Sequence, residues 1–186
     1  MRTSSIIAVA LLCISIPAVA QTSSVAEREI DAAKSLRLRG EYAAAEQKLN
    51  QVLQSQPEHF RATYNLGLAY SQSGKTTQAI QSLERATTLR EKSNAQDFTI
   101  YNTLGYLYMR EGDYASAEKQ FLKGLQFKDR LSPNSRGLLT NNLGTLYLSQ
   151  GKVDQAVPLF QEAVKAGNAA AKINLDVATR LAGSKR

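Results

Sequence analysis

The sequence has no tryptophan, one cysteine, one histidine and four prolines among its 186 residues. One thiol and one imidazole exclude an internal disulfide and the His/Cys clusters of zinc sites. No uninterrupted apolar stretch reaches the ~20 residues that a membrane-spanning helix needs. Hydrophobic residues make up 43% and charged residues 21% of the chain, which is typical of a folded domain. We therefore expect one domain with a sizeable core that is held together by packing alone.

The first twenty residues differ from the rest of the chain. Arg2 precedes an apolar stretch at residues 6–16, and the small residues Ala18-Val19-Ala20 follow. This order is typical of a secretory signal peptide with a small-x-small cleavage site. A retained membrane anchor is the alternative, but the apolar core is short for a spanning helix and Pro17 interrupts it. We predict cleavage after Ala20, and hence a periplasmic or secreted protein without a transmembrane segment.

The remaining features of this segment fit the same interpretation. Cys13 follows the bulky Leu12, whereas the lipid-modified cysteine of bacterial lipoproteins follows a small residue, so we assign Cys13 to the discarded segment. Without Arg2 the chain carries 22 basic and 16 acidic residues, a net charge of +6. The basic residues are mostly dispersed, which disfavours nucleic acid and favours weak attraction to anionic envelope polymers or lipid headgroups.

An eight-residue pattern at 63–70 returns at 101–108 and 140–147. Each copy contains Leu-Gly, two spacers and Tyr, and is followed by a second glycine and an alanine at 7 and 12 residues from the first glycine. A degenerate copy around Gly40 precedes them. The signature positions are Leu66, Gly67, Tyr70 and Ala79; Leu104, Gly105, Tyr108 and Ala117; and Leu143, Gly144, Tyr147 and Ala156.

Apolar residues recur at helical spacing on both sides of each second glycine, so each copy predicts two amphipathic helices around a tight turn. Pro158 lies inside one of these helices and predicts a slight kink or a late helix start, because its nitrogen cannot donate. The predicted organisation is a signal peptide at 1–20, a linker at 21–25, repeats at 26–59, 60–97, 98–136 and 137–168, a capping helix at 169–182 and a basic tail at 183–186.

The last helix has apolar residues at Ile173, Leu175, Val177 and Leu181, and polar ones at Lys172, Asp176 and Arg180. A stacked array needs a last helix with a polar outer face to cover its terminal hydrophobic surface. We therefore expect the apolar residues of this helix to face inward and the charged ones to face solvent.

These copies resemble tetratricopeptide repeats, whose pattern is W-x2-L-G-x2-Y, then A-x3-F, then P, at a period of about 34 residues. The first part matches the signature positions above, with Thr63, Tyr101 and Thr140 in place of tryptophan. The second part matches Ala45-x3-Leu49, Ala79-x3-Leu83, Ala117-x3-Phe121 and Ala156-x3-Phe160, and only Pro57 remains of the prolines. The resemblance covers nearly all of residues 26–166. It implies an all-α, right-handed α-solenoid of about four helix-turn-helix repeats plus the C-terminal capping helix.

The three mid-helix glycines need a physical reason, because glycine in a helix costs about 1 kcal/mol relative to alanine. We expect Gly67, Gly105 and Gly144 to allow close approach of the partner helix. The small residues Ala79, Ala117 and Ala156 are the expected neighbours.

The sequence gives no support for catalysis. The lone His59 follows Pro57 between helices and is interpreted as a solvated surface residue, and the carboxylates Glu27, Glu29, Glu118 and Glu162 are expected to be solvated as well. No metal-ligand cluster or phosphate-binding loop is present in the sequence. We therefore expect no enzymatic activity and no cofactor.

A binding surface has better support, because the first helices carry a second apolar set beside their packing stripe. In the resembled family such positions line a concave groove that binds a peptide. Apolar anchors interleaved with amides suit peptide recognition. The alternative is that residues such as Leu68 or Leu138 only pack against the next repeat. The candidate groove residues are Arg61, Tyr64, Leu68, Asn102, Tyr106, Met109, Arg110, Leu138, Asn141, Thr145 and Leu148.

Some members of the resembled family clamp a C-terminal carboxylate with Lys, Arg and Asn residues of successive first helices. Asn65 stands at one such place, with Lys34 and Arg37 on the preceding helix. Thr99 and Thr103 occupy the places of the next cations, so this clamp is not expected.

We therefore predict a non-enzymatic adaptor or scaffold of the cell envelope that binds a protein or peptide partner. Two alternatives stay open. One is a self-associating module, since solenoid ends can continue from one chain to the next. The other is an accessory protein held electrostatically to an anionic envelope polymer through Lys165, Lys172, Arg180, Lys185 and Arg186.

Overall fold

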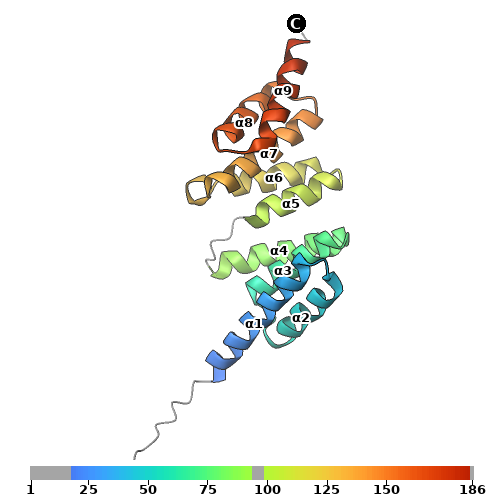
Figure 1. Cartoon of the computed structure of the whole chain (residues 1–186), viewed down its shortest axis with the longest axis vertical. Coiled ribbons are helices and arrows are strands. Elements are labelled where there is room, and N and C mark those ends of the chain that lie inside the picture. The colour runs from blue at the N-terminus through green and yellow to red at the C-terminus, as the bar shows by residue number, and fades with distance from the viewer. Residues whose placement is uncertain (1–17, 94–98, 185–186) are drawn as a thin grey trace, which may run out of the picture.

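The computed structural model describes the backbone of residues 18–93 and 99–184. Within these residues the chain forms nine α-helices and one short 3-10 helix, with no strand. The helices stack pair upon pair into an elongated array (Figure 1). The predicted all-α solenoid of helix pairs is thereby confirmed.

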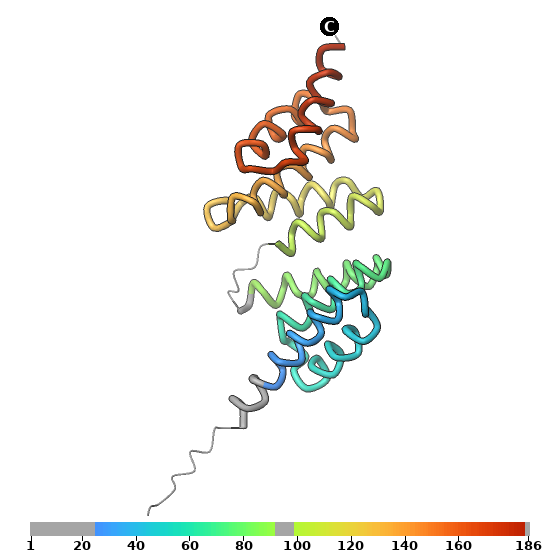
Figure 2. The backbone as a smooth tube through the Cα atoms, in the orientation of Figure 1, coloured from blue at the N-terminus to red at the C-terminus, as the bar shows by residue number. Residues whose placement is uncertain are grey.

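The helices form four pairs and a single last helix, which the backbone trace shows in order (Figure 2). The pairs are α1 Ala18–Leu38 with α2 Tyr42–Ser55, α3 Phe60–Gln72 with α4 Thr76–Ser93, α5 Thr99–Arg110 with α6 Tyr114–Leu125, and α7 Pro133–Ser149 with α8 Val153–Lys165. The last helix is α9, Ala169–Gly183, and the 3-10 helix η1, Lys128–Arg130, lies between α6 and α7.

Three details differ from the sequence-based boundaries or lie beyond the described chain. Residues 21–25, assigned to a linker, are part of α1. Helix α8 begins at Val153, well before Pro158, so the late helix start does not occur. The predicted signal segment up to residue 17, with Cys13, and the last two residues of the basic tail lie outside the described residues.

Each helix pair turns at a glycine with positive φ. The φ angles are 80° at Gly40, 80° at Gly74, 79° at Gly112 and 72° at Gly151, in the region that favours glycine. The residue after each of these glycines donates its N–H to the carbonyl five residues back, as Lys75 does to Tyr70 at 2.9 Å. This is the hydrogen bond of a Schellman C-cap, and it explains why the second glycine of each copy recurs at a fixed place.

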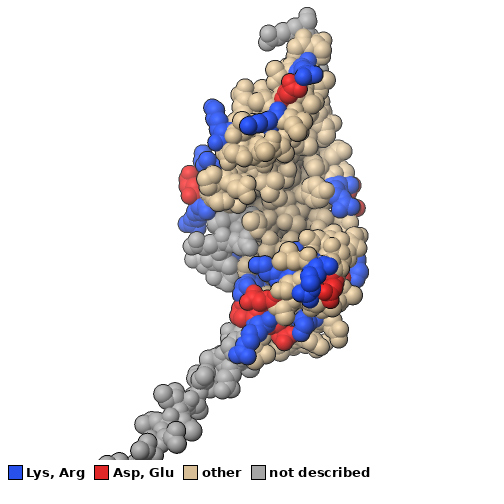
Figure 3. Space-filling model, in the orientation of Figure 1, with Lys and Arg blue, Asp and Glu red and all other residues tan. Residues whose placement is uncertain are grey.

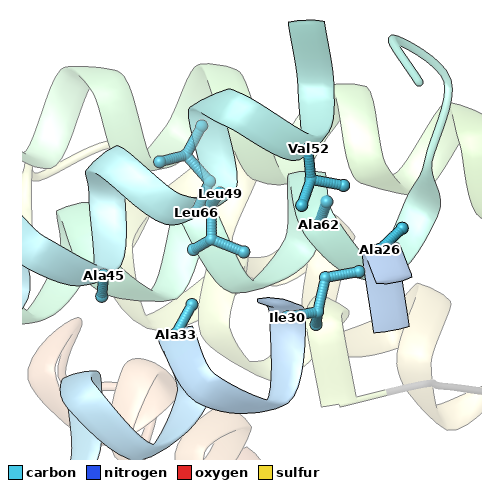
Figure 4. Packing of buried hydrophobic residues seen from close by; sticks show 8 residues of the cluster. All are labelled: Ala26, Ile30, Ala33, Ala45, Leu49, Val52, Ala62 and Leu66. Atoms are coloured by element: carbon cyan, nitrogen blue, oxygen red, sulfur yellow. The ribbon is translucent and has the colours of Figure 1, made fainter. Parts of the chain in front are cut away.

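The core consists of clusters shared between neighbouring repeats. In the first cluster, side chains from α1, α2 and α3 point toward one another (Figure 4). Because α3 belongs to the second repeat, the first helix pair completes its core only with its neighbour, as expected for a solenoid. The buried members are Ala26, Ile30, Ala33, Ala45, Leu49, Val52, Ala62 and Leu66.

Each mid-helix glycine lies against a large side chain of the partner helix. A Cβ added at Gly67 would lie 2.7 Å from Leu83 Cγ, and one added at Gly144 would lie 2.8 Å from Phe160 Cε1. The expectation of close helix approach is therefore confirmed, although the nearest neighbours are larger than the alanines that were expected. The nearest atoms belong to Leu83, Phe121 and Phe160, one helical turn after Ala79, Ala117 and Ala156.

The signature tyrosines connect successive repeats. Tyr108 donates its hydroxyl to Glu84 Oε1 at 2.5 Å, and Tyr147 donates to Glu118 Oε1 at 2.6 Å. Each acceptor lies on the second helix of the preceding repeat, so the expectation that Glu118 is only solvated is wrong. Burial, and then the hydrogen bond to Glu118, raises the pKa of Tyr147 to about 12. The same causes, with Glu84 as acceptor, raise the pKa of Tyr108.

Candidate functional site

The first candidate groove residue, Arg61 on α3, is committed to ion pairs with α1. Its guanidinium contacts Glu27, and its Nη2 lies 3.0 Å from Asp31 Oδ1. On the neighbouring surface Lys48 Nζ lies 2.7 Å from Glu29 Oε2. Glu27 and Glu29 were expected to be simply solvated, and their pairing corrects that expectation. These ion pairs join α2 and α3 to α1.

His59 is a structural residue at the start of α3. Its Nδ1 accepts a hydrogen bond from the Ala62 N–H at 3.4 Å, and its Nε2 lies 3.3 Å from Glu27 Oε1. The interpretation of His59 as a solvated surface residue is therefore wrong: it is the N-cap of α3 and is largely buried. Burial lowers the pKa of His59, because the imidazolium form loses hydration.

Four asparagines connect α5, α7 and α9. Asn142 Nδ2 donates to Asn102 Oδ1 at 2.9 Å, Asn141 Nδ2 donates to Asn142 Oδ1 at 3.4 Å, and Asn174 Nδ2 donates to Asn141 Oδ1 at 2.9 Å. We call these four residues the amide ladder. It crosses the first helices of the last two pairs, α5 and α7, and the last helix, α9.

Exposed apolar side chains surround the amide ladder. Tyr106, four residues after Asn102 on α5, is 45% exposed, and Leu138, four residues before Asn142 on α7, is 41% exposed. Residues three or four apart share a helix face, so both lie beside the ladder. We use the name amide face for the surface formed by the ladder, by Tyr106, Leu138 and Thr145, and by the exposed apolar residues of α9, which the next paragraph describes.

The last helix contributes to the amide face, contrary to the predicted cap. Ile173, Val177 and Leu181 are 71%, 44% and 43% exposed, whereas the buried positions of α9 are Ala171 and Ala178. Val177 and Leu181 follow Asn174 by three and seven residues, so they share its face. The expectation that α9 buries its large apolar residues under a charged outer face is therefore wrong: only Leu175 among the four predicted residues packs inward.

The amide face carries little charge. In the space-filling view, the centre of the upper half shows an area without charged side chains, bordered by blue and red atoms toward the C-terminal end and at the edges, while blue and red atoms mix in the lower half (Figure 3). Arg110, another candidate groove residue, is exposed and follows Tyr106 by four residues. The nearest pair on α9 is Arg180 with Asp176, 2.9 Å apart.

The other candidate groove residues are mostly used in packing. Tyr64 stacks on Phe60 with ring centroids 6.0 Å apart, and its hydroxyl lies 2.7 Å from Thr99 Oγ1. Met109 and Leu148 are partly buried against core clusters, Leu68 is half-buried, and Thr145 donates to the Asn141 carbonyl at 3.0 Å. The structure thus places Asn102, Tyr106, Leu138, Asn141 and Thr145 on one surface and keeps Arg61 and Tyr64 in contacts of the N-terminal half.

The carboxylate clamp lacks its components. Asn65 is buried and donates to the carbonyl of Arg61 on its own helix at 2.8 Å. Arg37 donates to Gln72 Oε1 at 2.9 Å. Asn65 is therefore a structural amide.

Sequence reasoning missed Asn142, Ile173, Asn174, Val177 and Leu181 as members of the amide face. The available signal was the spacing of the amides, since Asn141 and Asn174 are separated by 33 residues, close to the repeat period. Treating α9 as a cap hid this relation.

Other kinds of site have little support in the described part of the chain. No three His, Cys, Asp or Glu side chains there are placed to share a metal ion. None of the described helices combines the length and apolarity needed to cross a bilayer. A depression of about 560 Å³ on α6 is lined, among described residues, by one helix only: Ala115, Glu118, Lys119, Leu122, Lys123 and Gln126.

Comparison with known proteins agrees with this geometry. Two family models, both described as tetratricopeptide repeat, match residues 30–95 and 96–169. The two matched segments meet at the connection between α4 and α5 and together span α2–α8.

Solved structures show the same fold at low identity. MamA superposes with a TM-score of 0.71 at 20% identity, over 88% of this chain and 84% of that one. PilF of Pseudomonas aeruginosa gives 0.74 at 19% identity, over 85% and 69%, and BtubC from P. vanneervenii gives 0.72 at 18% identity, over 90% and 85%. The repeat signature, the helix-pair array and the two family matches agree, and the chain therefore belongs to the tetratricopeptide repeat family.

Proposed function

We propose that this chain is a non-enzymatic scaffold of the cell envelope that binds a polypeptide segment of a partner protein across its amide face. Membership of the tetratricopeptide repeat family supports a protein-interaction scaffold in general. The observation that carries the finer proposal is the cluster of exposed apolar side chains around an amide ladder that joins α5, α7 and α9.

Apolar side chains would supply most of the binding free energy. Tyr106, Leu138 and Ile173 are each exposed by more than two fifths. Aromatic and aliphatic anchors in the centre of an interface dominate affinity, because their burial removes apolar surface from water.

The two ends of the amide ladder offer hydrogen bonds that fix the register of a bound chain. Asn102 accepts within the ladder and Asn174 donates within it, so Asn102 Nδ2 and Asn174 Oδ1 have no partner among the described residues. A polypeptide main chain supplies the matching carbonyl and N–H. The ladder's internal bonds hold these two groups in place before the partner arrives, which lowers the entropic cost of binding.

The expected place of action is the periplasm or the extracellular space, on the basis of the signal-peptide layout. Cleavage after Ala20 would remove three residues of α1 and leave its buried Ala26, Ile30 and Ala33 in the core. N-terminal sequencing of the exported chain should give Gln21 as the first residue, and an uncleaved N-terminus would contradict the proposed localisation.

Site-specific photocrosslinking in the source cells tests the proposal. A photoreactive phenylalanine analogue is placed at Tyr106, Leu138 or Val177, and for control at Tyr114 or Leu122 of α6, which are equally exposed. One partner protein should crosslink from all three amide-face positions and from neither control. Equal yields from the controls would contradict an amide-face site, and crosslinks only to a second copy would indicate self-association instead.

The partner identified in this way allows a quantitative check. Tyr106→Ala and Leu138→Ala should each weaken binding by about tenfold or more, since anchor residues contribute above ~1 kcal/mol. Tyr114→Ala should leave the Kd unchanged. Raising the salt concentration should have only a modest effect, because the charged side chains beside the apolar anchors are Arg110 and the paired Arg180 and Asp176; a steep salt dependence would contradict the proposal.

A further inference from the structure

Equivalent positions of α5, α7 and α9 can be matched by what they pack against. Leu107, Leu146 and Ala178 are each 0% exposed, and each belongs to a core cluster with the second helix of the preceding repeat. The cluster partners are themselves equivalent: Ala79 with Leu83, Ala117 with Phe121, and Ala156 with Phe160. We call Leu107, Leu146 and Ala178 the reference positions. Because α5 contacts α7 and α7 contacts α9, residues at equal distances from the reference positions lie on neighbouring helices at matching places.

The amide ladder independently gives the same match. In both of its bonds between helices, the donor lies four residues before the reference position of its own helix. The acceptor lies five residues before the reference position of the preceding helix. The donors are Asn142 and Asn174, and the acceptors are Asn102 and Asn141. The same hydrogen bond thus occurs twice, so α9 stands in the register of a first helix.

Two rows of side chains cross the three helices beside the ladder. The first row lies one residue before the reference positions and consists of Tyr106, Thr145 and Val177. The second row lies three residues after them and consists of Arg110, Ser149 and Leu181. All of these side chains are exposed except that of Thr145, which is half-buried. Residues four apart share a helix face, so the two rows lie next to each other.

The two rows change in character from α5 to α9. At the α5 end, Arg110 is exposed and forms no ion pair within the described residues, and the nearby Asp113 is engaged in capping α6. At the α9 end both rows finish in an aliphatic residue, and the nearest cation, Arg180, lies 2.9 Å from Asp176. One end of the rows therefore favours a carboxylate and the other an apolar side chain.

The positive character continues on the N-terminal side of α5. Gln72 of α3 follows Gly67 by five residues, as Arg110 follows Gly105, so it holds the place of Arg110 on that helix. Arg37 of α1 donates to Gln72 Oε1 at 2.9 Å, and its buried Nε has no hydrogen-bond partner within the described residues. Neither Arg37 nor Arg110 is paired with a carboxylate in the described chain.

We propose, on the basis of the proposed function, that the segment bound across the amide face is an extended chain with an aspartate or glutamate at its α5 end and an aliphatic residue at its α9 end. Packed helices lie about 8–10 Å apart, so an extended chain at ~3.3 Å per residue needs about five or six residues to pass from α5 over α7 to α9. The carboxylate then pairs with Arg110, and the aliphatic side chain covers Val177 and Leu181. Arg110 thereby sets the orientation of the bound segment.

Phage display of random twelve-residue peptides on the full chain tests this inference. Selected peptides should contain Asp or Glu about five or six positions from Leu, Ile or Val, in the spacing that the helix separation requires. Synthetic copies with an amidated C-terminus should still bind, because the carboxylate belongs to a side chain. Their binding should weaken on Tyr106→Ala and Leu138→Ala, which shows that they occupy the amide face.

Reversal of one charge identifies Arg110 as the specificity residue. Arg110→Glu should weaken binding of an acidic peptide by about tenfold, because an exposed ion pair contributes up to about fivefold and the reversed charge repels. Replacing the peptide's acid by Lys should restore binding to this variant and weaken binding to the unsubstituted chain. The matched control is Arg28→Glu, an exposed arginine of α1 without an ion pair in the described part of the chain.

The aliphatic end is tested in the same way. Val177→Ser should relax the preference for an aliphatic residue at the far end of the selected peptides. Val25→Ser is the matched control, because Val25 of α1 is 53% exposed and lies outside the amide face. Circular dichroism confirms that all four variants fold.

Each contrary outcome overturns the inference in a recognisable way. Peptides that need Tyr106 and Leu138 but show no acidic preference would remove the role of Arg110 and leave the proposed function intact. Equal weakening by Arg28→Glu would show that only net charge matters, and loss of binding on amidation would assign the carboxylate to a chain end. Failure to select any peptide would exclude an extended segment, whereas amide-face crosslinks to a folded partner would still support the proposed function.

Discussion

Replacing Gly105 by alanine tests the close packing between α5 and α6. The added Cβ would lie 2.5, 2.6 and 2.8 Å from three ring carbons of Phe121, whereas carbon atoms in ordinary contact are about 3.5–4.0 Å apart. Phe121 is fully buried, so its ring moves only if the helix interface moves with it. Overpacking of this kind costs about 1–3 kcal/mol, and the better helix propensity of alanine offsets about 1 kcal/mol. Because all three distances are shorter than 3.0 Å and the ring is buried, we expect the upper part of that range, about 2–3 kcal/mol, and hence a net loss of about 1–2 kcal/mol.

Two further glycines provide a graded comparison and a control. At Gly144 the nearest ring carbons of Phe160 would lie 2.8, 3.0 and 3.2 Å away, so Gly144→Ala should cost less than Gly105→Ala. At Gly183 an added Cβ meets nothing within 4 Å, so Gly183→Ala should be neutral or stabilising by up to about 1 kcal/mol. Urea unfolding followed by far-UV circular dichroism measures all three, and a loss of 1–2 kcal/mol should lower Tm by about 2–8 °C.

A result in which Gly105→Ala is as stable as the unsubstituted chain would refute the tight-contact argument. A double-mutant cycle with Phe121→Leu gives a second check. The smaller side chain leaves room for the added methyl group, so alanine at 105 should cost less in that background. Strict additivity of the two substitutions would show that these residues do not interact as proposed.

Three other predictions concern polar contacts. Asn141→Ala removes the central member of the amide ladder and leaves Asn174 without its acceptor. Urea unfolding should therefore show that the free energy of unfolding falls by about 1–3 kcal/mol. An unchanged unfolding midpoint would contradict a structural role for the ladder. In a spectrophotometric titration, Tyr147 should ionise near pH 12, with Tyr108 also above the ordinary value of about 10, and Glu118→Gln should lower the midpoint for Tyr147. Because the folded state favours the neutral phenol of Tyr147, the stability it contributes is complete below pH ~10 and is lost as pH rises toward 12. NMR titration of the single histidine should give a pKa below its ordinary value of about 6.5. Because the fold favours neutral His59, the free energy of unfolding should fall as pH drops below about 6.5. The substitution His59→Asn keeps an N-cap side chain and should abolish this pH dependence.

The fold was accessible from the sequence because its determinants are local. The apolar face of a helix is recognisable because apolar residues recur with a period of 3.6 residues. A turn with positive φ is recognisable because glycine recurs at a fixed position. The recurrence of Gly74, Gly112 and Gly151 therefore predicted the turns, and the apolar periods predicted the helices on both sides. Stacking of neighbouring pairs follows, since one pair cannot bury its own apolar face.

The candidate site was only partly accessible, because its members come from different helices. Asn102, Tyr106, Leu138 and Asn141 were identified from their place beside the packing stripe. Asn174 was missed, since its role depends on hydrogen bonds across 33 residues rather than on any local pattern. His59 was misread partly for the same reason, because its Nε2 faces Glu27 on another helix, whereas its cap on the Ala62 N–H is a local contact that the sequence did not reveal.

The sequence by itself thus determined the helix pairs, their turns and their order in one array, because these depend on residues a few positions apart. Only the tertiary structure decided which side chain each signature glycine faces, which of the two apolar sets of α9 is buried, and which carboxylates are paired. Those outcomes depend on how far one helix is shifted and rotated against the next. A rotation of α9 by part of a turn exchanges Ala171 and Ala178 for Ile173 and Val177, and no spacing within that helix distinguishes the two arrangements.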